Sequence, residues 1–146
     1  MPKVNLFFDS SALIAGIVSD KGAARALLLL AEDTRITITV SEQVITEVER
    51  NIARKVPTAL VFTRELLRQT NFVIVHDSDR KALKKHADWV SHPADLPILI
   101  AAVQAKTDYF VTLKPKHFID DPLVSQRSGL RIGTPGDALR WVRDHL

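Results

Sequence analysis

Short apolar segments alternate with helical segments along this chain of 146 residues, and the alternation restricts the folds that it can adopt. Four apolar segments are strand candidates because they are short and rich in β-branched or aromatic residues, and a weaker fifth lies near the end. They span residues 4–8, 35–40, 71–75, 109–112 and 130–132. Apolar strands that are separated by helices are typical of parallel sheets covered on both faces. The sequence therefore predicts an α/β fold.

Helical segments fill the intervals between these strands. They span residues 21–32, 41–54, 57–69, 79–90, 94–105 and 135–145, and a further helix starts at Ser10. Residues 27–30 are all leucine, which indicates burial on two sides or a surface shared with a partner, and burial is the commoner case. No linker or repeat interrupts the pattern, so we expect a single domain over residues 1–146.

Composition excludes several kinds of chemistry. The chain has no cysteine, which rules out disulfides, a thiolate nucleophile and cysteine-ligated zinc. A net charge of +3 and a pI near 9.4 are compatible with a polyanionic partner without requiring one. No signal peptide and no membrane-spanning segment is recognisable, so we expect a cytoplasmic protein.

Polar residues follow the predicted strands where the strands end. Asp9 follows the first strand, Asp77 the third, and Thr112 ends the fourth, while Asp95 opens the helix before the fourth strand. Right-handed connections bring the carboxyl ends of parallel strands to one edge, where open α/β sheets place their sites. Asp9 is therefore either a helix cap, which is the commoner use of Asp at such a turn, or a metal ligand or acid/base group.

Another candidate acid lies on the helix over residues 41–54, but helical geometry does not decide between Glu47 and Glu49 for this role. Glu47 lies roughly 115° and Glu49 roughly 85° from the centre of the apolar face of that helix. Glutamates in such positions are usually solvated, so the helical period leaves both residues open as candidates.

Four motifs contain these polar residues in a characteristic order. They are residues 6–15 (LFFDSSALIA), 41–47 (SEQVITE), 95–102 (DLPILIAA) and 107–112 (TDYFVT), followed by Lys116-His117-Phe118. Together they resemble the PIN-domain nucleases, and most closely the small VapC-type toxins of toxin–antitoxin pairs. The resemblance covers nearly the whole chain. It implies a three-layer α/β/α sandwich with a central parallel sheet, and a divalent-metal-dependent endoribonuclease that uses Mg²⁺ or Mn²⁺.

The resemblance also implies site residues. The family's acidic cluster corresponds to Asp9, Glu47 and Asp95, which selects Glu47 over Glu49. Three crowded carboxylates repel one another without a cation, and Mg²⁺ and Mn²⁺ prefer oxygen ligands. We expect Asp9 and Asp95 to bind the metal directly and Glu47 to bind it through water or to position the attacking water.

Two hydroxyl residues fall beside these acids in the sequence. Ser10 follows Asp9, and Thr112 ends the fourth strand. Either hydroxyl is expected to hydrogen-bond the carboxylates or the scissile phosphate.

The chain departs from the family at Lys114. Many members carry a fourth acid two residues after the threonine that ends the fourth strand, and here this position is Lys114. A lysine does not bind a second metal, but it can contact phosphate or replace one cationic charge of a two-metal site. We therefore favour one metal. Asp120 and Asp121 lie nearby and are possible substitutes for the missing acid.

Basic residues continue after Lys114. Lys116 and His117 either contact RNA phosphates or belong to a solvated basic loop, and the two interpretations are evenly balanced. His117 is expected to be structural or phosphate-binding rather than a general base. Asp108 precedes its strand, so we expect it at the opposite edge of the sheet with a structural role.

The leading hypothesis is an endoribonuclease that acts on RNA and is neutralised by a small antitoxin protein. A homodimer is a further possibility, because members of the family tend to dimerise. The alternative is a PIN-like module that binds RNA or protein without cutting, because the acidic set is incomplete at Lys114. A phosphate-acceptor signalling domain of similar topology is a weaker third hypothesis, since it would need paired acids near the first strand and only Asp9 is present there.

Overall fold

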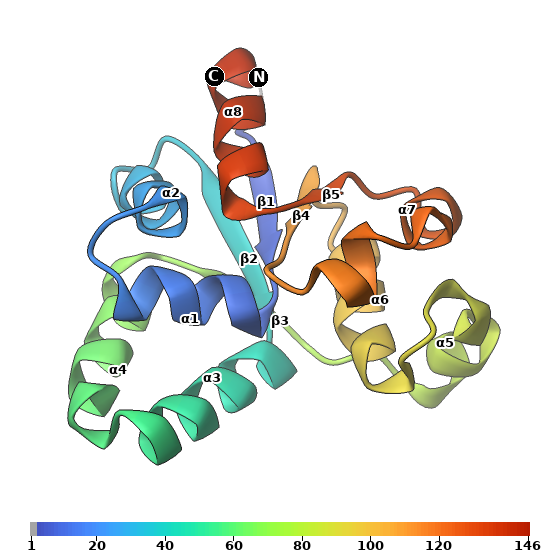
Figure 1. Ribbon diagram of the computed structural model, residues 1–146, viewed down its shortest axis with the longest axis horizontal. Coiled ribbons are helices and arrows are strands. Elements are labelled where there is room, and N and C mark those ends of the chain that lie inside the picture. The colour runs from blue at the N-terminus through green and yellow to red at the C-terminus, as the bar shows by residue number, and fades with distance from the viewer. Residues whose placement is uncertain (1–2) are drawn as a thin grey trace.

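The computed structural model describes residues 3–146, and its centre is a sheet of five parallel strands in the order β3-β2-β1-β4-β5 (Figure 1). The strands are β1 (Asn5–Phe8), β2 (Thr37–Ser41), β3 (Val73–Val75), β4 (Tyr109–Val111) and β5 (Ile132–Gly133). The chain starts in the middle of the sheet, builds outward to β3, and then returns to the other side of β1. The prediction of a central parallel sheet is confirmed.

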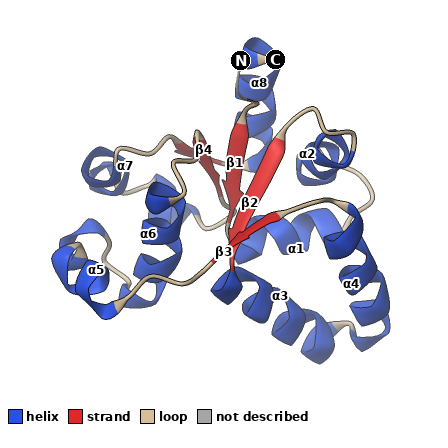
Figure 2. Ribbon diagram, turned by 180° about the vertical axis from the view of Figure 1, so that it is seen from behind, coloured by secondary structure: helices blue, strands red, loops and turns tan. Residues whose placement is uncertain are grey.

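Helices cover both faces of this sheet (Figures 1 and 2). One layer contains α1 (Ser10–Val18), α2 (Ala23–Glu32), α3 (Glu42–Lys55), α4 (Leu60–Gln69) and α8 (Pro135–His145). The other contains α5 (Arg80–Lys85), α6 (Leu96–Gln104) and α7 (Pro122–Ser128). The connections between strands are right-handed, so the face that a connecting helix covers depends on the direction in which the chain moves along the sheet. The chain moves one way from β1 to β3 and the other way from β3 to β5, which places the connecting helices of the two halves on opposite faces. The result is the predicted α/β/α sandwich.

The structure corrects several predicted helices. The segment over residues 57–69 starts as a 3₁₀ turn, η1 (Pro57–Ala59), and residues 79–90 divide into α5 and a second 3₁₀ turn, η2 (Ala87–Trp89). A third turn, η3 (Pro93–Asp95), precedes α6. After β4 come a π-helical turn, η4 (Pro115–Ile119), and α7, neither of which was predicted. Prolines begin four of these segments, because proline fits the first turn of a helix but does not continue one.

Two strand-to-helix junctions are closed by side-chain caps. The Asp9 carboxylate accepts a hydrogen bond from the Ala12 amide at 2.9 Å and so caps α1. Ser41, the last residue of β2, accepts from the Val44 amide at 3.3 Å and caps α3. For Asp9 the cap was one of the two roles considered from the sequence. The two caps turn the chain directly from a strand into a helix and keep the polar cap residues at the carboxyl edge of the sheet.

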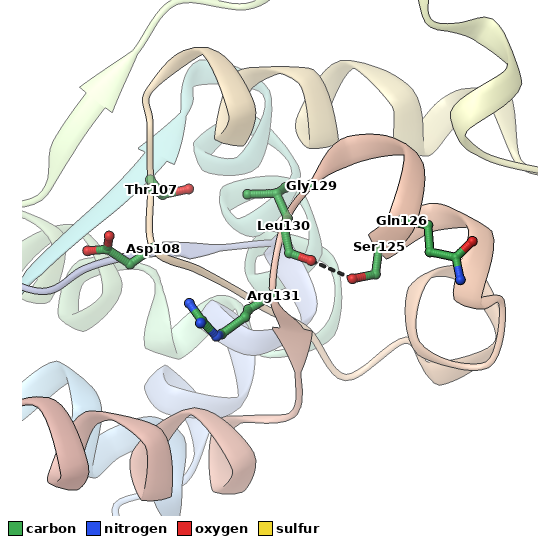
Figure 3. Close-up of a pocket in the computed structure, with 7 residues that line it drawn as sticks. All are labelled: Thr107, Asp108, Ser125, Gln126, Gly129, Leu130 and Arg131. Atoms are coloured by element: carbon green, nitrogen blue, oxygen red, sulfur yellow. Dashed lines mark hydrogen bonds between the residues drawn. The ribbon is translucent and has the colours of Figure 1, made fainter.

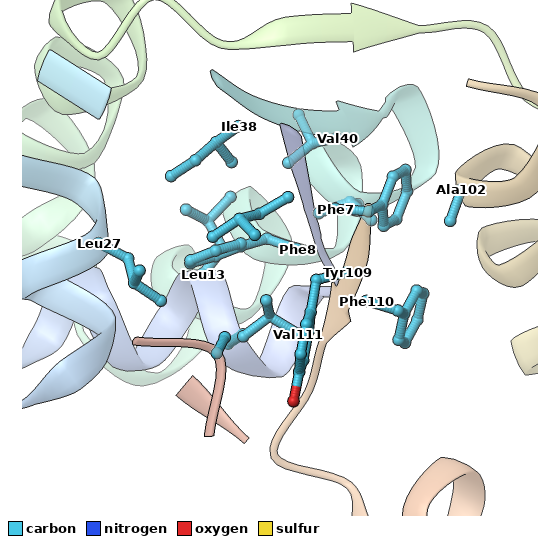
Figure 4. Close-up of a cluster of buried hydrophobic side chains, with 14 of the residues drawn as sticks. Phe7, Phe8, Leu13, Leu27, Ile38, Val40, Ala102, Tyr109, Phe110 and Val111 are labelled. Atoms are coloured by element: carbon cyan, nitrogen blue, oxygen red, sulfur yellow. The ribbon is translucent and has the colours of Figure 1, made fainter. Parts of the chain in front are cut away.

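The core lies on both faces of β1 and β4 (Figure 4). Phe7 and Phe110 are fully buried and stack with their ring centroids 5.6 Å apart, on the side where Ala102 of α6 lies. Phe8 points the other way, toward Leu13 of α1. Successive side chains of a strand face opposite sides, so each of these two strands contributes to both halves of the core.

The leucines of α2 are not all buried. Leu27 and Leu28 are fully enclosed, whereas Leu29 is 55% exposed, so the expected burial on two sides holds for only part of the run. Helix α2 packs against α1 and α8, which leaves one side of it uncovered. Across residues 3–146, every helix is too short or too polar to cross a membrane.

Replacing Phe7 by alanine is expected to lower the free energy of unfolding by about 3–5 kcal/mol, because the change leaves a cavity next to Phe110. Phe62, which is 48% exposed on α4, is the matched control, and Phe62→Ala should cost about 1 kcal/mol or less. Urea denaturation measures both values. Equal losses for the two variants would contradict the placement of the core.

Candidate functional site

The carboxyl ends of β1 and β4 form the topological switch point of the sheet. These strands are neighbours, but the connections that follow them leave in opposite directions, and open α/β sheets bind ligands outside such a point. Asp9 follows β1 and Thr112 follows β4, and the Thr112 hydroxyl donates to Asp9 Oδ2 at 2.5 Å. The amino ends of α1, α3 and α6 lie at the same edge, where their partial positive charges favour anionic groups.

Asp9 is almost completely buried, with 1% of its surface exposed. Its Oδ1 accepts from the Ser11 hydroxyl at 2.6 Å as well as from the Ala12 amide. Burial raises the pKa of Asp9 above its ordinary value, while the hydrogen bonds from Ser11 and Thr112 and the charge of Lys114 act in the opposite direction. Desolvation is the largest of these effects, so ionising this carboxyl group in the folded protein costs free energy.

The same hydroxyls bind the loop after β4. Ser11 Oγ accepts from the Leu113 amide at 2.9 Å, and Thr112 Oγ1 accepts from the Lys114 amide at 3.0 Å. Each hydroxyl therefore donates to Asp9 and accepts from the loop. This arrangement fixes the path of the backbone where it leaves the sheet and so places Lys114 beside the buried carboxylate.

Glu47 lies on α3 and is connected to the end of β1. Its Oε2 is 3.4 Å from the Ser10 hydroxyl, and its Oε1 is 3.3 Å from Gln43 Nε2. Glu49 instead reaches Arg64 of α4, with 3.8 Å between Glu49 Oε2 and Arg64 Nη2. The two glutamates therefore have different surroundings, and Glu47 is the one that lies near Asp9.

Glu47, Asp95 and Lys114 line one hollow at this edge, with a volume of about 550 Å³. The remaining lining residues come from α3 and from the segments that follow β3 and precede α6. They are Gln43, Thr46, Arg50, Asp77 and Ala94. Three carboxylates and two cations thus share the hollow, which gives it a formal charge of −1.

Asp95 opens α6 without capping it. The Asp95 side chain makes no hydrogen bond to the first turn of the helix, and its Oδ2 instead lies 2.6 Å from His117 Nδ1. Only 5% of Asp95 is exposed. The residue was expected at this position, but the sequence did not predict its contact with His117.

Other residues considered from the sequence lie away from the hollow. Lys116 is exposed and is not part of the lining. Asp121 caps α7 by accepting from the Leu123 amide at 3.0 Å. Asp108 lies at the opposite edge of the sheet, as expected, and accepts from the Asn5 amide at 2.8 Å.

The acids of the site are not drawn together into a tight cluster. Within residues 3–146, no three side chains of the His, Asp or Glu type are arranged so that they could hold a metal ion together. Asp9 does not line the hollow, and its two oxygens are occupied by Ser11, Ala12 and Thr112. Glu47 and Asp95 are the predicted acids that the hollow exposes to a ligand.

Four polar residues of the hollow were not assigned to the site from sequence: Gln43, Thr46, Arg50 and Asp77. Arg50 follows Glu47 by three positions and Gln43 by seven, which places all three on one side of α3. The helical period is therefore the sequence signal that places Arg50 on the same side of the helix as Glu47. Asp77, after β3, accepts from the Gln43 amide at 2.9 Å, and no sequence pattern predicts that contact.

A second hollow of about 550 Å³ lies at the amino edge of the sheet (Figure 3). Asp108 and Arg131 lie on either side of it, and the Ser125 hydroxyl donates to the Leu130 carbonyl at 2.5 Å. Its single acid is Asp108, which already accepts the Asn5 amide. The carboxyl edge, with several acids and the helix amino ends, is therefore the stronger candidate for a functional site.

Comparisons with known proteins identify a family and a similar fold. The chain matches the family described as "PIN domain" over residues 5–114, a segment that includes the three predicted acids. It also resembles the crystal structure of PAE2754 from Pyrobaculum aerophilum, with a TM-score of 0.64 and 15% sequence identity over 97% of this chain and 90% of that one. At this identity the likeness concerns the fold alone. No curated protein sequence matches the chain.

Replacing Asp9 by asparagine is expected to stabilise the metal-free protein at neutral pH by on the order of 1 kcal/mol. The raised pKa of Asp9 means that its ionisation weakens the fold as the pH rises from about 4, the unfolded value, through the folded-state value. Asparagine caps a helix equally well and does not ionise, and its amide nitrogen can donate to Thr112 Oγ1 where Asp9 Oδ2 accepts from it.

Urea denaturation in the presence of a chelator, repeated across this pH range, measures the effect. The difference between Asp9→Asn and the native chain should grow as the pH rises and then level off. A difference that stays constant with pH would contradict the proposed cost of ionising Asp9.

Proposed function

The chain belongs to the PIN-domain family, whose members are generally nucleases, and on that premise we propose that it is a divalent-metal-dependent endoribonuclease that hydrolyses RNA phosphodiester bonds. The observation that carries the proposal is the position of Glu47 and Asp95 on one hollow beside the switch point, with Ser10 linking Glu47 to the turn that holds Asp9. Acids in this position can bind a hard cation and present it to a phosphate.

The donor set of the hollow suits Mg²⁺ or Mn²⁺. The side chains that could bind a cation there offer oxygen atoms, and these hard cations prefer oxygen ligands. Mg²⁺ is usually held by one or two carboxylates and substrate phosphates while it keeps several waters, so a tight three-acid cluster is not required. A bound cation would lower the pKa of a water and neutralise charge on the phosphate.

The charge of the hollow supports one cation rather than two. With Arg50 and Lys114 present, the formal charge of the lining is −1, and Asp9, which would share the cation, makes the charge of the site −2. One divalent cation neutralises this charge and so removes the repulsion of the anionic phosphodiester. An aspartate in place of Lys114, as in many members of the family, would make the charge −4 and leave it negative after one cation. Lys114 therefore provides in the protein the positive charge that a second metal would bring.

Each residue then has a proposed role. Asp95 would bind the cation directly from the hollow, and Asp9 would bind it directly through the one lone-pair position that its three accepted hydrogen bonds leave free. Glu47 would bind it through water or position the attacking water. Ser10 and Thr112 hold the carboxylates by hydrogen bonds. The two cations of the hollow, Arg50 and Lys114, contact the phosphates of the RNA.

We further propose that the protein is the toxin of a toxin–antitoxin pair, with a small antitoxin protein as its partner, and that it forms a homodimer. The likeness of its four motifs to the VapC-type toxins supports this assignment. A short antitoxin gene beside this one and growth arrest on expression are the expected observations. An isolated gene without toxicity would count against the assignment.

A binding module that does not cut RNA is the second candidate. Two observations favour it: Lys114 replaces an acid, and within residues 3–146 the acids are not gathered into a metal-binding group. The second candidate binds RNA or protein without cutting, so cleavage of RNA in the presence of Mn²⁺ separates the two.

Replacing Asp95 by asparagine should reduce Mn²⁺-dependent cleavage of a panel of structured RNAs by about two to four orders of magnitude, because the variant loses a charged ligand. Asp108→Asn, a carboxylate at the opposite edge, is the control and should cut at the native rate. Denaturing gels measure the cleavage. If neither Mg²⁺ nor Mn²⁺ supports cutting, or if Asp95→Asn cuts as well as the native chain, the nuclease proposal fails.

Replacing Lys114 by alanine should weaken RNA binding and lower the slope of log affinity against log salt concentration by about one, because one phosphate contact is lost. Lys116→Ala is the matched control, since Lys116 lies two residues away but outside the hollow. Fluorescence anisotropy at several salt concentrations gives both slopes. The same change in both variants would show that the loop acts only through its overall charge.

A further inference from the structure

The carboxylate of Asp95 contacts His117, a histidine that does not line the hollow. His117 Nδ1 lies 2.6 Å from Asp95 Oδ2, whereas Asp95 Oδ1 makes no hydrogen bond within residues 3–146. No fully buried side-chain oxygen in this part of the chain lacks a partner, so Oδ1 retains access to solvent. One oxygen of Asp95 is therefore fixed by the protein and the other is available to a ligand.

The His117 ring is itself held in place. His92 stacks on it, with ring centroids 4.0 Å apart and the rings inclined by 10°. His117 belongs to the π-helical turn η4, and such turns are rare and frequent at functional sites. His92 precedes η3, the turn that contains Asp95. Two segments that are separate in the sequence thus contribute one ring each to a stack beside this carboxylate.

The direction of the hydrogen bond follows from the chemistry of the two groups. An ionised carboxylate only accepts hydrogen bonds, so His117 Nδ1 carries the hydrogen and donates it to Asp95. Groups that bind a metal are generally oriented by such outer hydrogen bonds, and removing the outer partner weakens metal binding. The Asp95–His117 pair has the form of such an arrangement.

We propose that His117 is a positioning residue, and that together with the stacked ring of His92 it orients the Asp95 carboxylate so that Oδ1 is presented to a divalent cation in the hollow. This inference rests on the proposed function, because it assigns a supporting residue to the same site. It gives His117 a role distinct from phosphate binding and from general base catalysis. It also explains why Asp95 does not cap α6, since its carboxylate is turned toward His117.

Direct measurement of Mn²⁺ affinity tests the proposal without relying on cleavage. At about pH 8, His117→Ala should weaken Mn²⁺ binding roughly 10- to 100-fold, the usual effect of losing an outer hydrogen-bond partner. His92→Ala should weaken it less, because the donor remains and only the stack is lost. Titration calorimetry or the signal of free Mn²⁺ in electron paramagnetic resonance gives the affinities.

Two amide variants separate orientation from a general structural role. His117→Asn places its amide nitrogen where Nδ1 lies and should restore most of the affinity, whereas His117→Gln places it near Nε2 and should behave like His117→Ala. His76→Ala is the matched control, because His76 Nδ1 lies 3.0 Å from Glu42 Oε1 in an exposed pair outside the hollow. This control should bind Mn²⁺ with native affinity.

Several outcomes would overturn the inference. They are native affinity in His117→Ala, an asparagine variant that binds as weakly as the alanine variant, and a loss of thermal stability with no loss of Mn²⁺ affinity. Asp95→Asn is measured alongside. If that variant binds Mn²⁺ as well as the native chain, the proposed function fails and the inference fails with it. If Asp95→Asn loses affinity while His117→Ala does not, only the inference fails.

Discussion

The hydrogen bond between Thr112 and the buried carboxylate of Asp9 joins the two strands at the centre of the fold. A carboxylate at the end of an apolar strand is costly to bury unless donors surround it, and here the donors come from both neighbouring elements. Ser11 and Ala12 belong to the first turn of α1, and Thr112 directly follows β4. The hydroxyls of Ser11 and Thr112 also accept hydrogen bonds from backbone amides of the loop after β4. The side chains that stabilise the Asp9 carboxylate therefore also fix the path of that loop. The position of Lys114 follows from this constraint, and the His117 amide donates to the Lys114 carbonyl at 3.2 Å.

The three acids differ in how firmly they are held, and the difference parallels their proposed roles. Contacts to Asp9 and Asp95 are 2.5–2.9 Å long, whereas those to Glu47 are 3.3–3.4 Å. Short contacts fix a carboxylate before a ligand arrives, which suits a direct ligand. The looser contacts of Glu47, from a half-buried position on α3, leave it free to adjust to a bound water. Ser10 links the two kinds of acid, since it follows Asp9 and contacts Glu47.

Sequence predicted those parts of the fold that depend on local pattern. The helix over residues 135–145 was predicted with its observed ends, and the strands were predicted to within two residues, because apolar runs and caps are local features. Helix α7 was missed although Asp121, Pro122 and Gly129 are a typical cap, first turn and left-handed end, since the segment has no apolar period. In the site, Asp9 and Asp95 followed from strand and helix ends, while Glu47 needed the family resemblance. The contacts of Asp77 and His117 join distant segments, which no local pattern reveals.

Lys114 changes the electrostatics of the site and does not simply remove an acid. Its charge opposes the rise that burial causes in the pKa of Asp9, so it helps to keep that carboxylate ionised. In a site with a fourth acid, the same position would add negative charge, and cations from solution would have to compensate all four groups. Here the chain supplies part of that compensation, and the Thr112 hydroxyl accepts the backbone amide of the same lysine. A site built in this way requires fewer cations, because one divalent cation is enough to neutralise it and to remove its repulsion of phosphate.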